Sequence, residues 1–157
     1  MQINTQKSQI PEVGEGKRGE DGHLGYLLRQ AANAFRGNME VALQDSSLTS
    51  PQFLVLTMIE AYPGASNADL ARLTMLTPQT VSVIVANLEK SGDILRRPHH
   101  QHGRIVHLDM TVQGTQNLRQ AKHSLYDFEN QLAAGFDEAE LAVVKRWLVA
   151  VAKQKTV

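Results

Sequence analysis

The stretch from residue 77 to residue 92, TPQTVSVIVANLEKSG, decides how the rest of the chain must be arranged. Thr77 can cap the start of a helix through its hydroxyl. Pro78 fits the first helical position, because the amide hydrogen that it lacks has no partner there. Gly92 suits the left-handed conformation just past a helix end. Between these residues, apolar side chains recur at i, i+3, i+4 and i+7, which predicts one buried stripe: Val81, Ile84, Val85 and Leu88.

The opposite face of this predicted helix carries uncharged side chains that can donate or accept hydrogen bonds or make methyl contacts. Such groups suit the base edges that DNA exposes in its major groove. An ordinary amphipathic helix is the simpler interpretation of the stripe alone, so the neighbouring segments must decide between the two. The candidate contact residues are Gln79, Thr80, Ser82, Val83 and Asn87.

A shorter helix is predicted directly before this stretch, between residues 66 and 73. Ser66 followed by Asp69 is typical of a capping box, in which the two side chains satisfy free amides at a helix start. Met75 and Leu76 leave only a tight link to Thr77. Two helices joined by so short a turn, the second one longer and polar outside, favour a helix-turn-helix.

Further helices are predicted upstream. Pro51 suits the first position of one helix, with Ser50 as the expected cap, and the pair at residues 63–64, Pro-Gly, stops it. An apolar repeat predicts another helix over residues 23–43. Residues 1–22 are polar and rich in glycine, and we expect them to form a flexible arm.

A β-hairpin is predicted directly after Gly92. Residues 94–97 and 104–108 have the alternating pattern of two short strands, and a loop separates them. Such a hairpin behind a helix-turn-helix is a wing. The formal net charge of the chain is zero, which argues mildly against DNA binding. Basic residues nevertheless gather on and beside the wing, and we expect a local basic edge formed by Arg72, Lys90, Arg96, Arg97 and Arg104.

Two helices are predicted at the C-terminal end. Thr111 is the expected cap of a long helix that ends near Ala134, and Asp137 with Glu140 forms another capping box before the last helix. The long helix has an apolar stripe of Leu118, Ala121, Leu125, Phe128 and Leu132. One small lobe cannot cover the stripes of all the terminal helices, so pairing with a second copy is expected.

Composition narrows the classes of function. The chain has no cysteine, which excludes disulfides, thiolate zinc sites and thiol redox sensing. No apolar run approaches the roughly 20 residues that span a bilayer, and no signal peptide is visible, so a cytoplasmic location is expected. The sequence lacks a glycine-rich phosphate loop, a G-x-S-x-G elbow and a His-carboxylate helix motif, so it is not expected to be an enzyme or to hold a cofactor.

A histidine cluster is the one candidate metal site. His99, His100 and His102 lie close together in the predicted wing loop. A closed structural zinc site needs four fixed donors, and we expect a wing tip to be mobile. Histidines that face solvent or phosphate are therefore the favoured interpretation, and a metal is not predicted.

Three segments resemble the MarR family of bacterial transcriptional regulators. They are LTSPQFLVL (48–56), NADLARLTMLTPQTVSVIVANLEKSG (67–92) and RRPHHQHGRIVHLDMTVQG (96–114). The resemblance covers residues 24–153. It implies a mainly α fold with a small β-wing, in which residues 48–110 form a winged helix-turn-helix lobe. Residues 23–45 and 111–153 would form the helices of a homodimer that binds a pseudo-palindromic operator, often as a repressor released by a small ligand.

The resemblance also implies the DNA contacts. Base contacts would come from Thr77, Gln79, Thr80, Ser82, Val83 and Asn87, and Arg104 would enter the minor groove, where an arginine favours narrow A·T-rich segments. Phosphate contacts are expected from Ser66 and Arg72, and a further contact from Arg97 on the wing. The two recognition helices of the dimer would lie about 34 Å apart, one turn of duplex.

The chain departs from the family pattern at two places. The family commonly has arginine where this chain has Val83 and Asn87. Its wing usually reads D-x-R-D-x-R, whereas here His99, Gln101 and His102 replace three of the charged residues and only Arg104 remains. The sequence therefore does not predict the usual salt-bridge brace of the wing, and DNA binding weaker or more pH-sensitive than is typical is expected.

Effector contacts are expected between the dimer helices and the DNA-binding lobe. Arg29 could pair with a carboxylate, while Tyr26 and Phe35 could stack on an aromatic ring, with Met58 beside them. These residues suit an aromatic or phenolic acid. Because the recognition face carries little charge, a dimeric interaction or sensor protein without specific DNA binding stays open as the alternative.

Overall fold

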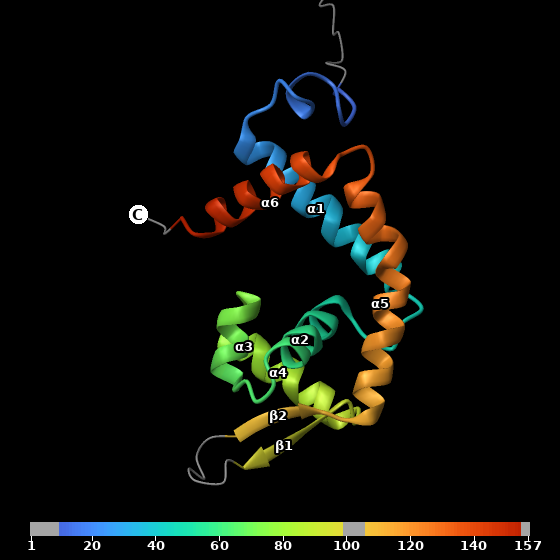
Figure 1. Cartoon of the computed structure of the whole chain (residues 1–157), viewed down its shortest axis with the longest axis vertical. Coiled ribbons are helices and arrows are strands. Elements are labelled where there is room, and N and C mark those ends of the chain that lie inside the picture. Colours follow the sequence, from blue (N-terminus) through green and yellow to red (C-terminus); the bar gives the residue numbers. More distant parts are fainter. Residues whose placement is uncertain (1–9, 99–105, 155–157) are drawn as a thin grey trace, which may run out of the picture. The chain divides into compact units, whose positions relative to one another are not determined.

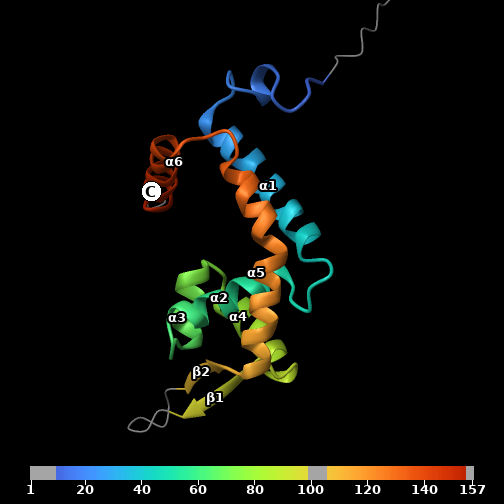
Figure 2. The same ribbon diagram turned by 45° about the vertical axis from the view of Figure 1, so that its right-hand side comes forward.

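The computed structural model describes residues 10–98 and 106–154. The chain divides into two units, residues 1–38 and 39–157, and the division falls within the first helix. Figures 1 and 2 show the course of the chain. The elements are η1 (Gly16–Arg18), α1 (Leu24–Ala42), α2 (Ser50–Ala61), α3 (Asn67–Thr74), α4 (Pro78–Lys90), β1 (Ile94–Pro98), β2 (Val106–Met110), α5 (Val112–Ala133) and α6 (Glu138–Ala152).

The first unit contains local structure before α1. Residues 16–18 form a turn of 3-10 helix, and Arg18 donates through its guanidinium to the carbonyl of Pro11 at 2.8 Å. The side-chain amide of Gln30 on α1 donates to the carbonyl of Arg18 at 3.1 Å. The flexible arm predicted for residues 1–22 stays a prediction, but its described half is tied to α1 by these bonds.

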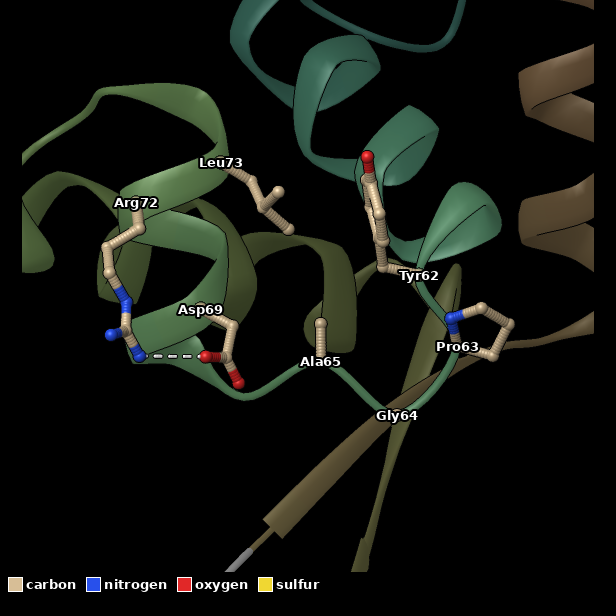
Figure 3. A pocket seen from close by; sticks show the side chains of 7 residues that line it. All are labelled: Tyr62, Pro63, Gly64, Ala65, Asp69, Arg72 and Leu73. Carbon is tan, nitrogen blue, oxygen red and sulfur yellow. Dashed lines mark hydrogen bonds and ion pairs between the residues drawn. The ribbon is translucent and has the colours of Figure 1, made fainter.

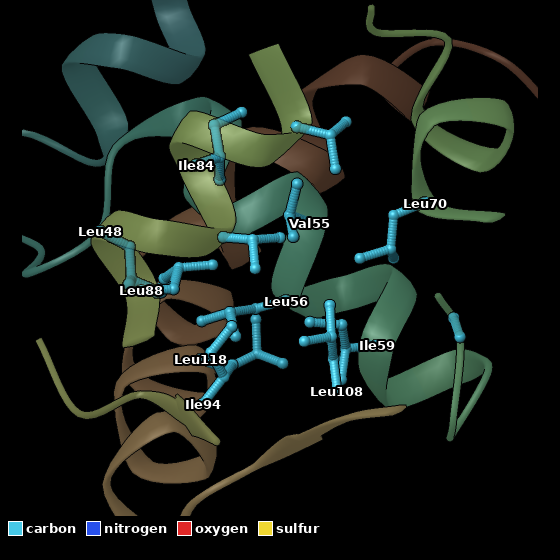
Figure 4. Packing of buried hydrophobic residues seen from close by; sticks show 14 of the residues in the cluster. Leu48, Val55, Leu56, Ile59, Leu70, Ile84, Leu88, Ile94, Leu108 and Leu118 are labelled. Atoms are coloured by element: carbon cyan, nitrogen blue, oxygen red, sulfur yellow. The ribbon is translucent and has the colours of Figure 1, made fainter. Parts of the chain in front are cut away.

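In the second unit, α2, α3 and α4 surround one hydrophobic core that the wing and the first half of α5 complete (Figure 4). The predicted stripe of α4 is confirmed, because Val81, Ile84, Val85 and Leu88 are all buried. The side chains that close the core from the other elements include Leu56, Leu70, Ile94, Leu108 and Leu118. Burial of side chains of this size contributes roughly 1.5–3 kcal/mol each, so this core stabilises the lobe.

The stripe of α5 is covered within the chain over most of its length. Leu118, Ala121 and Leu125 are buried in the core, and Phe128 packs against it. Leu132, one turn later, is exposed. Only the C-terminal end of the stripe is thus left uncovered in a single chain, so the lobe covers more of this stripe than the prediction of pairing with a second copy suggested.

Turn residues set the element boundaries, and two predictions were wrong in detail. The cap of α2 is Thr49 and not Ser50, because only Thr49 has Gln52 three residues on to complete a capping box. The second wing strand, β2, is described over Val106–Met110 and ends two residues later than predicted, while the predicted start at residues 104 and 105 lies outside the described part. The strands are antiparallel, with Arg96 opposite Leu108.

The fold is mainly helical with a two-stranded wing, as predicted. Gly92 follows α4 with φ at 81°, which confirms its predicted role past the helix end. No helix in the described part of the chain is long and apolar enough to cross a membrane.

Candidate nucleic-acid interface

Helix α4 presents one buried face and one exposed polar face. Thr77 caps the helix by accepting a hydrogen bond from the amide of Thr80 at 3.2 Å, and Pro78 opens it. Val83 is 61% exposed, although it is as apolar as the buried stripe behind it. The five candidate base-contacting residues all lie on the exposed side of α4: Gln79, Thr80, Ser82, Val83 and Asn87.

The turn between α3 and α4 is as short as predicted. Met75 ends α3 in the left-handed conformation, with φ at 56°, and its side chain is 81% exposed. Leu76 is half-buried beside the core. The reversal of chain direction in these residues lets α3 pack across the buried side of α4 and leaves the polar side of α4 uncovered by α3.

The start of α3 is a capping box in which Ser66 and Asp69 bind one another. The amide of Asp69 donates to the Ser66 hydroxyl at 3.2 Å, and the Ser66 amide donates to the Asp69 carboxylate at 3.1 Å. Arg72 adds an ion pair to the same carboxylate at 2.9 Å. The bonds from Ser66, and then the charge of Arg72, hold the pKa of Asp69 below its usual value. Both predicted phosphate contacts, Ser66 and Arg72, are therefore bonded to one carboxylate.

The wing is braced by ion pairs that the sequence pattern did not indicate. Arg97 on β1 pairs with Asp109 on β2, and this guanidinium holds the pKa of Asp109 below its usual value. Arg96 pairs with Glu89 on α4 at 2.8 Å. The family's usual brace was not predicted for this wing, and the two pairs supply another one.

The predicted basic edge is consequently more balanced than expected. Each of its arginines within the described residues has a carboxylate partner: Arg72 with Asp69, Arg96 with Glu89, and Arg97 with Asp109. Two of these acids come from other elements, so linear spacing did not reveal them. Arg104, the predicted minor-groove residue, lies outside the described residues, as do His99, His100 and His102.

The wing is also tied to the turn between α2 and α3. His107 on β2 lies with its Nδ1 2.5 Å from the carbonyl oxygen of Gly64. Gly64 has φ at 81°, and a β-carbon there would lie 2.8 Å from the same nitrogen. Sequence reasoning assigned neither residue to this contact, because a bond between positions so far apart leaves no periodic signal.

Hollows open on the described part of this unit beside α3, beside the wing and beside the start of α2. One, of about 440 Å³, lies at the outer side of α3 and is lined by Tyr62, Pro63, Gly64, Ala65, Asp69, Arg72 and Leu73 (Figure 3). Another, of about 480 Å³, lies between the start of α3 and the wing, against Ser66, Arg96 and His107 among others. None of the four predicted effector residues lines any of these hollows.

The predicted effector residues do not all belong to one unit of the chain, because three lie in residues 1–38 and one lies in residues 39–157. Tyr26, Arg29 and Phe35 are exposed on α1, and the Tyr26 hydroxyl donates to the side chain of Gln30 at 3.3 Å. Met58 is half-buried on α2 and packs against the core. Their shared role stays a prediction. No group of three or more His, Asp or Glu side chains in the described ranges could hold a metal ion.

Comparison with known proteins identifies the lineage of this winged lobe. The MarR family matches residues 48–106, which run from the last residue before the α2 cap into the wing. The HTH-type transcriptional repressor Rv2887 of Mycobacterium tuberculosis is 33% identical over 103 residues, which cover 66% of this chain and 74% of that protein. This chain belongs to the MarR family.

Solved structures agree with the fold, among them one of a MarR family protein. The structure of Rv2887 in complex with DNA has a TM-score of 0.66 at 28% identity and covers 83% of this chain and 98% of the other. The repressor CouR, bound to a 23-mer DNA duplex, has a TM-score of 0.78 at 23% identity over 91% of this chain and 100% of its own. The Bordetella bronchiseptica BpsR structure, which concerns regulation of DNA binding by 6-hydroxynicotinic acid, has a TM-score of 0.76 at 19% identity, over 94% of this chain and 100% of that one.

Membership of the MarR family confirms the main predictions from sequence. The protein is a DNA-binding transcriptional regulator with a winged helix-turn-helix, and it is not an enzyme. In this MarR protein, α3 and α4 are the helix-turn-helix and the β1–β2 hairpin is the wing.

Proposed function

We propose that this MarR protein is a cytoplasmic homodimeric repressor that binds a pseudo-palindromic operator and leaves it when an aromatic or phenolic acid binds. The observation that carries the proposal is the exposed polar face of α4 on a helix whose other face is buried. A helix so held can enter the major groove without disturbing the core. The repressor activity of Rv2887 supports the direction of regulation.

The uncharged groups on α4 suit base contacts better than phosphate contacts. Gln79 and Asn87 carry amides of the kind that bind adenine in two places, and the Val83 side chain suits a thymine methyl group. Affinity that does not depend on sequence would then rest on the wing and on α3. Arg104 would supply the minor-groove contact there.

The dimer is proposed from the exposed apolar side chains of α6. Val144 and Leu148 lie one turn apart on this helix and are 43% and 45% exposed in a single chain. A helix with such a stripe is stable in water only when another surface covers it. A second copy fits the operator symmetry proposed above.

Gel-shift titration with the promoter region of the chain's own gene tests the proposal. At low salt we expect a specific complex that survives excess competitor DNA and weakens as salt rises. Arg104→Ala should weaken it strongly while the dimer persists. Arg119→Ala, which removes an exposed arginine from α5, is the matched control and should have little effect.

The alternative function predicts a different outcome. A dimeric interaction protein without specific DNA binding would give no specific complex even at low salt. A thermal-shift screen of aromatic acids, with 6-hydroxynicotinic acid among them, then tests the effector. A ligand of the folded protein raises its Tm, and it should release DNA at the same concentrations.

A further inference from the structure

Asp93 is a buried carboxylate at the junction of α4, β1 and α5. Its exposed fraction is 3%, and it directly follows Gly92. Burial of a charged group is unfavourable unless hydrogen bonds replace the lost water. The burial of Asp93 therefore needs a physical reason. Asp93 belongs neither to the proposed DNA contacts nor to the proposed effector site.

Two side chains bind the carboxylate from different helices. The Ser91 hydroxyl, at the end of α4, donates to Oδ2, and Asn117 on α5 donates through its side-chain amide to Oδ1 at 2.7 Å. The backbone of Asp93 adds two more bonds. Its amide donates to the carbonyl of Leu88 at 2.9 Å, and its carbonyl accepts from the amide of Thr111 at 3.0 Å.

The surrounding junction leaves no space between the two helices. The Thr111 hydroxyl donates to the carbonyl of Gly92 at 2.6 Å, and Gln113 donates to the carbonyl of Ser91 at 2.8 Å. A β-carbon on Gly114 would lie 2.0 Å from the carbonyl oxygen of Asp93. The first turn of α5 is therefore in contact with the chain just past α4, and the side-chain pair Asp93–Asn117 lies at the centre of this contact.

A change of angle at this junction would be amplified along α5. The helix has 22 residues, which at 1.5 Å per residue is about 33 Å. A tilt of about 5° at its start would displace its far end by about 3 Å. Two recognition helices held on a duplex through such a pair of helices would lose their register with the two half-sites.

We propose that Asp93 and Asn117 are positioning residues that set the angle between the reading helix α4 and the helix α5, and with it the half-site spacing that the dimer accepts. The proposal rests on the proposed function as a dimeric operator-binding protein. Asp93 is buried and acts through α4 and α5 without touching DNA. The hydrogen bond between Asp93 and Asn117 favours one arrangement of the two helices, because a hydrogen bond depends on the direction from donor to acceptor. Apolar packing alone has no such directional requirement.

The test exchanges the two side chains. Asn117→Asp puts a second carboxylate against the first, so the helices must separate or one acid must take up a proton. Asp93→Asn keeps the shape, because its amide can donate to Ser91 while its carbonyl oxygen accepts from Asn117. The double variant D93N/N117D restores one carboxylate and one amide with their roles exchanged. Gln116→Asp adds the same charge one residue away on the exposed side of α5 and is the matched control.

Gel-shift titrations are run on the operator and on versions with one base pair inserted or deleted between the half-sites. We expect N117D to bind the operator about tenfold or more weakly, equivalent to about 1.4 kcal/mol, and to discriminate less between spacings. D93N, the double variant and Q116D should stay near the parent in both respects. Sedimentation should show a dimer for all of them.

A readout without DNA separates this proposal from the proposed function. Amide hydrogen exchange in N117D should rise at residues 89–95 and 111–114 and fall back in the double variant. If the parent binds no operator, the function fails but this measurement still decides about the pair. If N117D does not fold, Asn117→Ala deletes the donor without adding charge and takes its place, with a loss of about threefold or more expected. The proposal would be overturned if the folded single variant showed the amide hydrogen exchange and the spacing preference of the parent. It would also be overturned if the double variant D93N/N117D did not restore both.

Discussion

At the scale of single residues, the arginines beside the recognition helix that the structure describes are already bound by carboxylates. Arg96 and Arg97 pair with Glu89 and Asp109, and Arg72 pairs with Asp69. A phosphate must therefore compete with a carboxylate for each guanidinium. The electrostatic gain on binding should be smaller than a count of arginines suggests. This agrees with the proposed recognition face of α4, which consists of uncharged groups.

The contact between Gly64 and His107 is tested by a pair of glycine substitutions. Gly64 and Gly92 share a φ of 81°, but a β-carbon at Gly64 would lie 2.8 Å from His107 whereas one at Gly92 meets Gln113 only at 3.6 Å. Gly92→Ala should cost about 1–2 kcal/mol for its backbone alone. Gly64→Ala should cost more, because the ring must also move. Urea denaturation measures both, and equal losses would mean that the His107 contact contributes nothing.

The ion pair of the wing predicts a pH dependence. The pKa of Asp109 is lowered chiefly by its bond to Arg97, so the ionised carboxylate stabilises the folded chain above about pH 4, and this is lost as the pH falls through the lowered pKa. Asp109→Asn should reduce the free energy of unfolding at pH 7 by about 1 kcal/mol or less, because the side chain of its partner Arg97 is 65% exposed to solvent. The difference between parent and variant should shrink as the pH falls from 7 through the lowered pKa of Asp109. A difference that does not change as the pH falls contradicts the assignment.

At the scale of elements, α4 and its surroundings show how far local sequence reaches. The caps at Thr77 and Ser66, the glycine after α4 and the buried stripe were all predicted, because each depends on residues within one or two turns. Thr49 was missed in favour of its neighbour Ser50, since both are good caps and only the bond that the Thr49 amide donates to the side chain of Gln52 separates them. The choice between two neighbouring cap residues depends on backbone geometry, and amino-acid preferences for cap positions do not include that geometry.

The contacts that join elements could not be predicted in the same way. Asp93 reads as a turn residue, and its partner Asn117 is 24 positions away. The acids that pair with Arg96 and Arg97 belong to α4 and β2. Leu125 belongs to an apolar stripe of α5 whose cover the sequence left open between the chain's own lobe and a second copy, and it is buried in the chain's own core. Periodicity predicts that a helix face is covered, but it does not show which residues cover it.

The face of α4 is tested by binding-site selection. Gln79→Ala or Asn87→Ala should relax the preference at one base position by about 1–3 kcal/mol, because a base-edge contact is lost while the fold is unchanged. Glu138→Ala, at the start of α6, is a control for which the selected motif should stay the same. If selection returns the parent motif for both α4 variants, these side chains do not read bases.

At the scale of the whole molecule, the apolar side chains of α6 predict association. Leu148 is 45% exposed in one chain, so Leu148→Glu should weaken the dimer without opening the core of the lobe. Ala142→Glu is the matched control, because this position lies beside Lys145 and Arg146 on the polar side of the helix. Sedimentation velocity separates the two. A stable dimer of Leu148→Glu at micromolar concentration would refute the assignment of this face.

The left-handed backbone conformation of Met75 has a consequence for the thermal stability of the protein. A residue with a β-carbon is held there in a conformation that glycine adopts without strain, and its side chain lies in solvent. Met75→Gly should therefore raise the Tm, with a gain in unfolding free energy of up to about 1 kcal/mol. A melting curve below that of the parent would show that the thioether makes a useful contact after all. If the Met75→Gly variant still regulates its gene, the thermal stability of this regulator can be changed at one loop position without a change in DNA recognition.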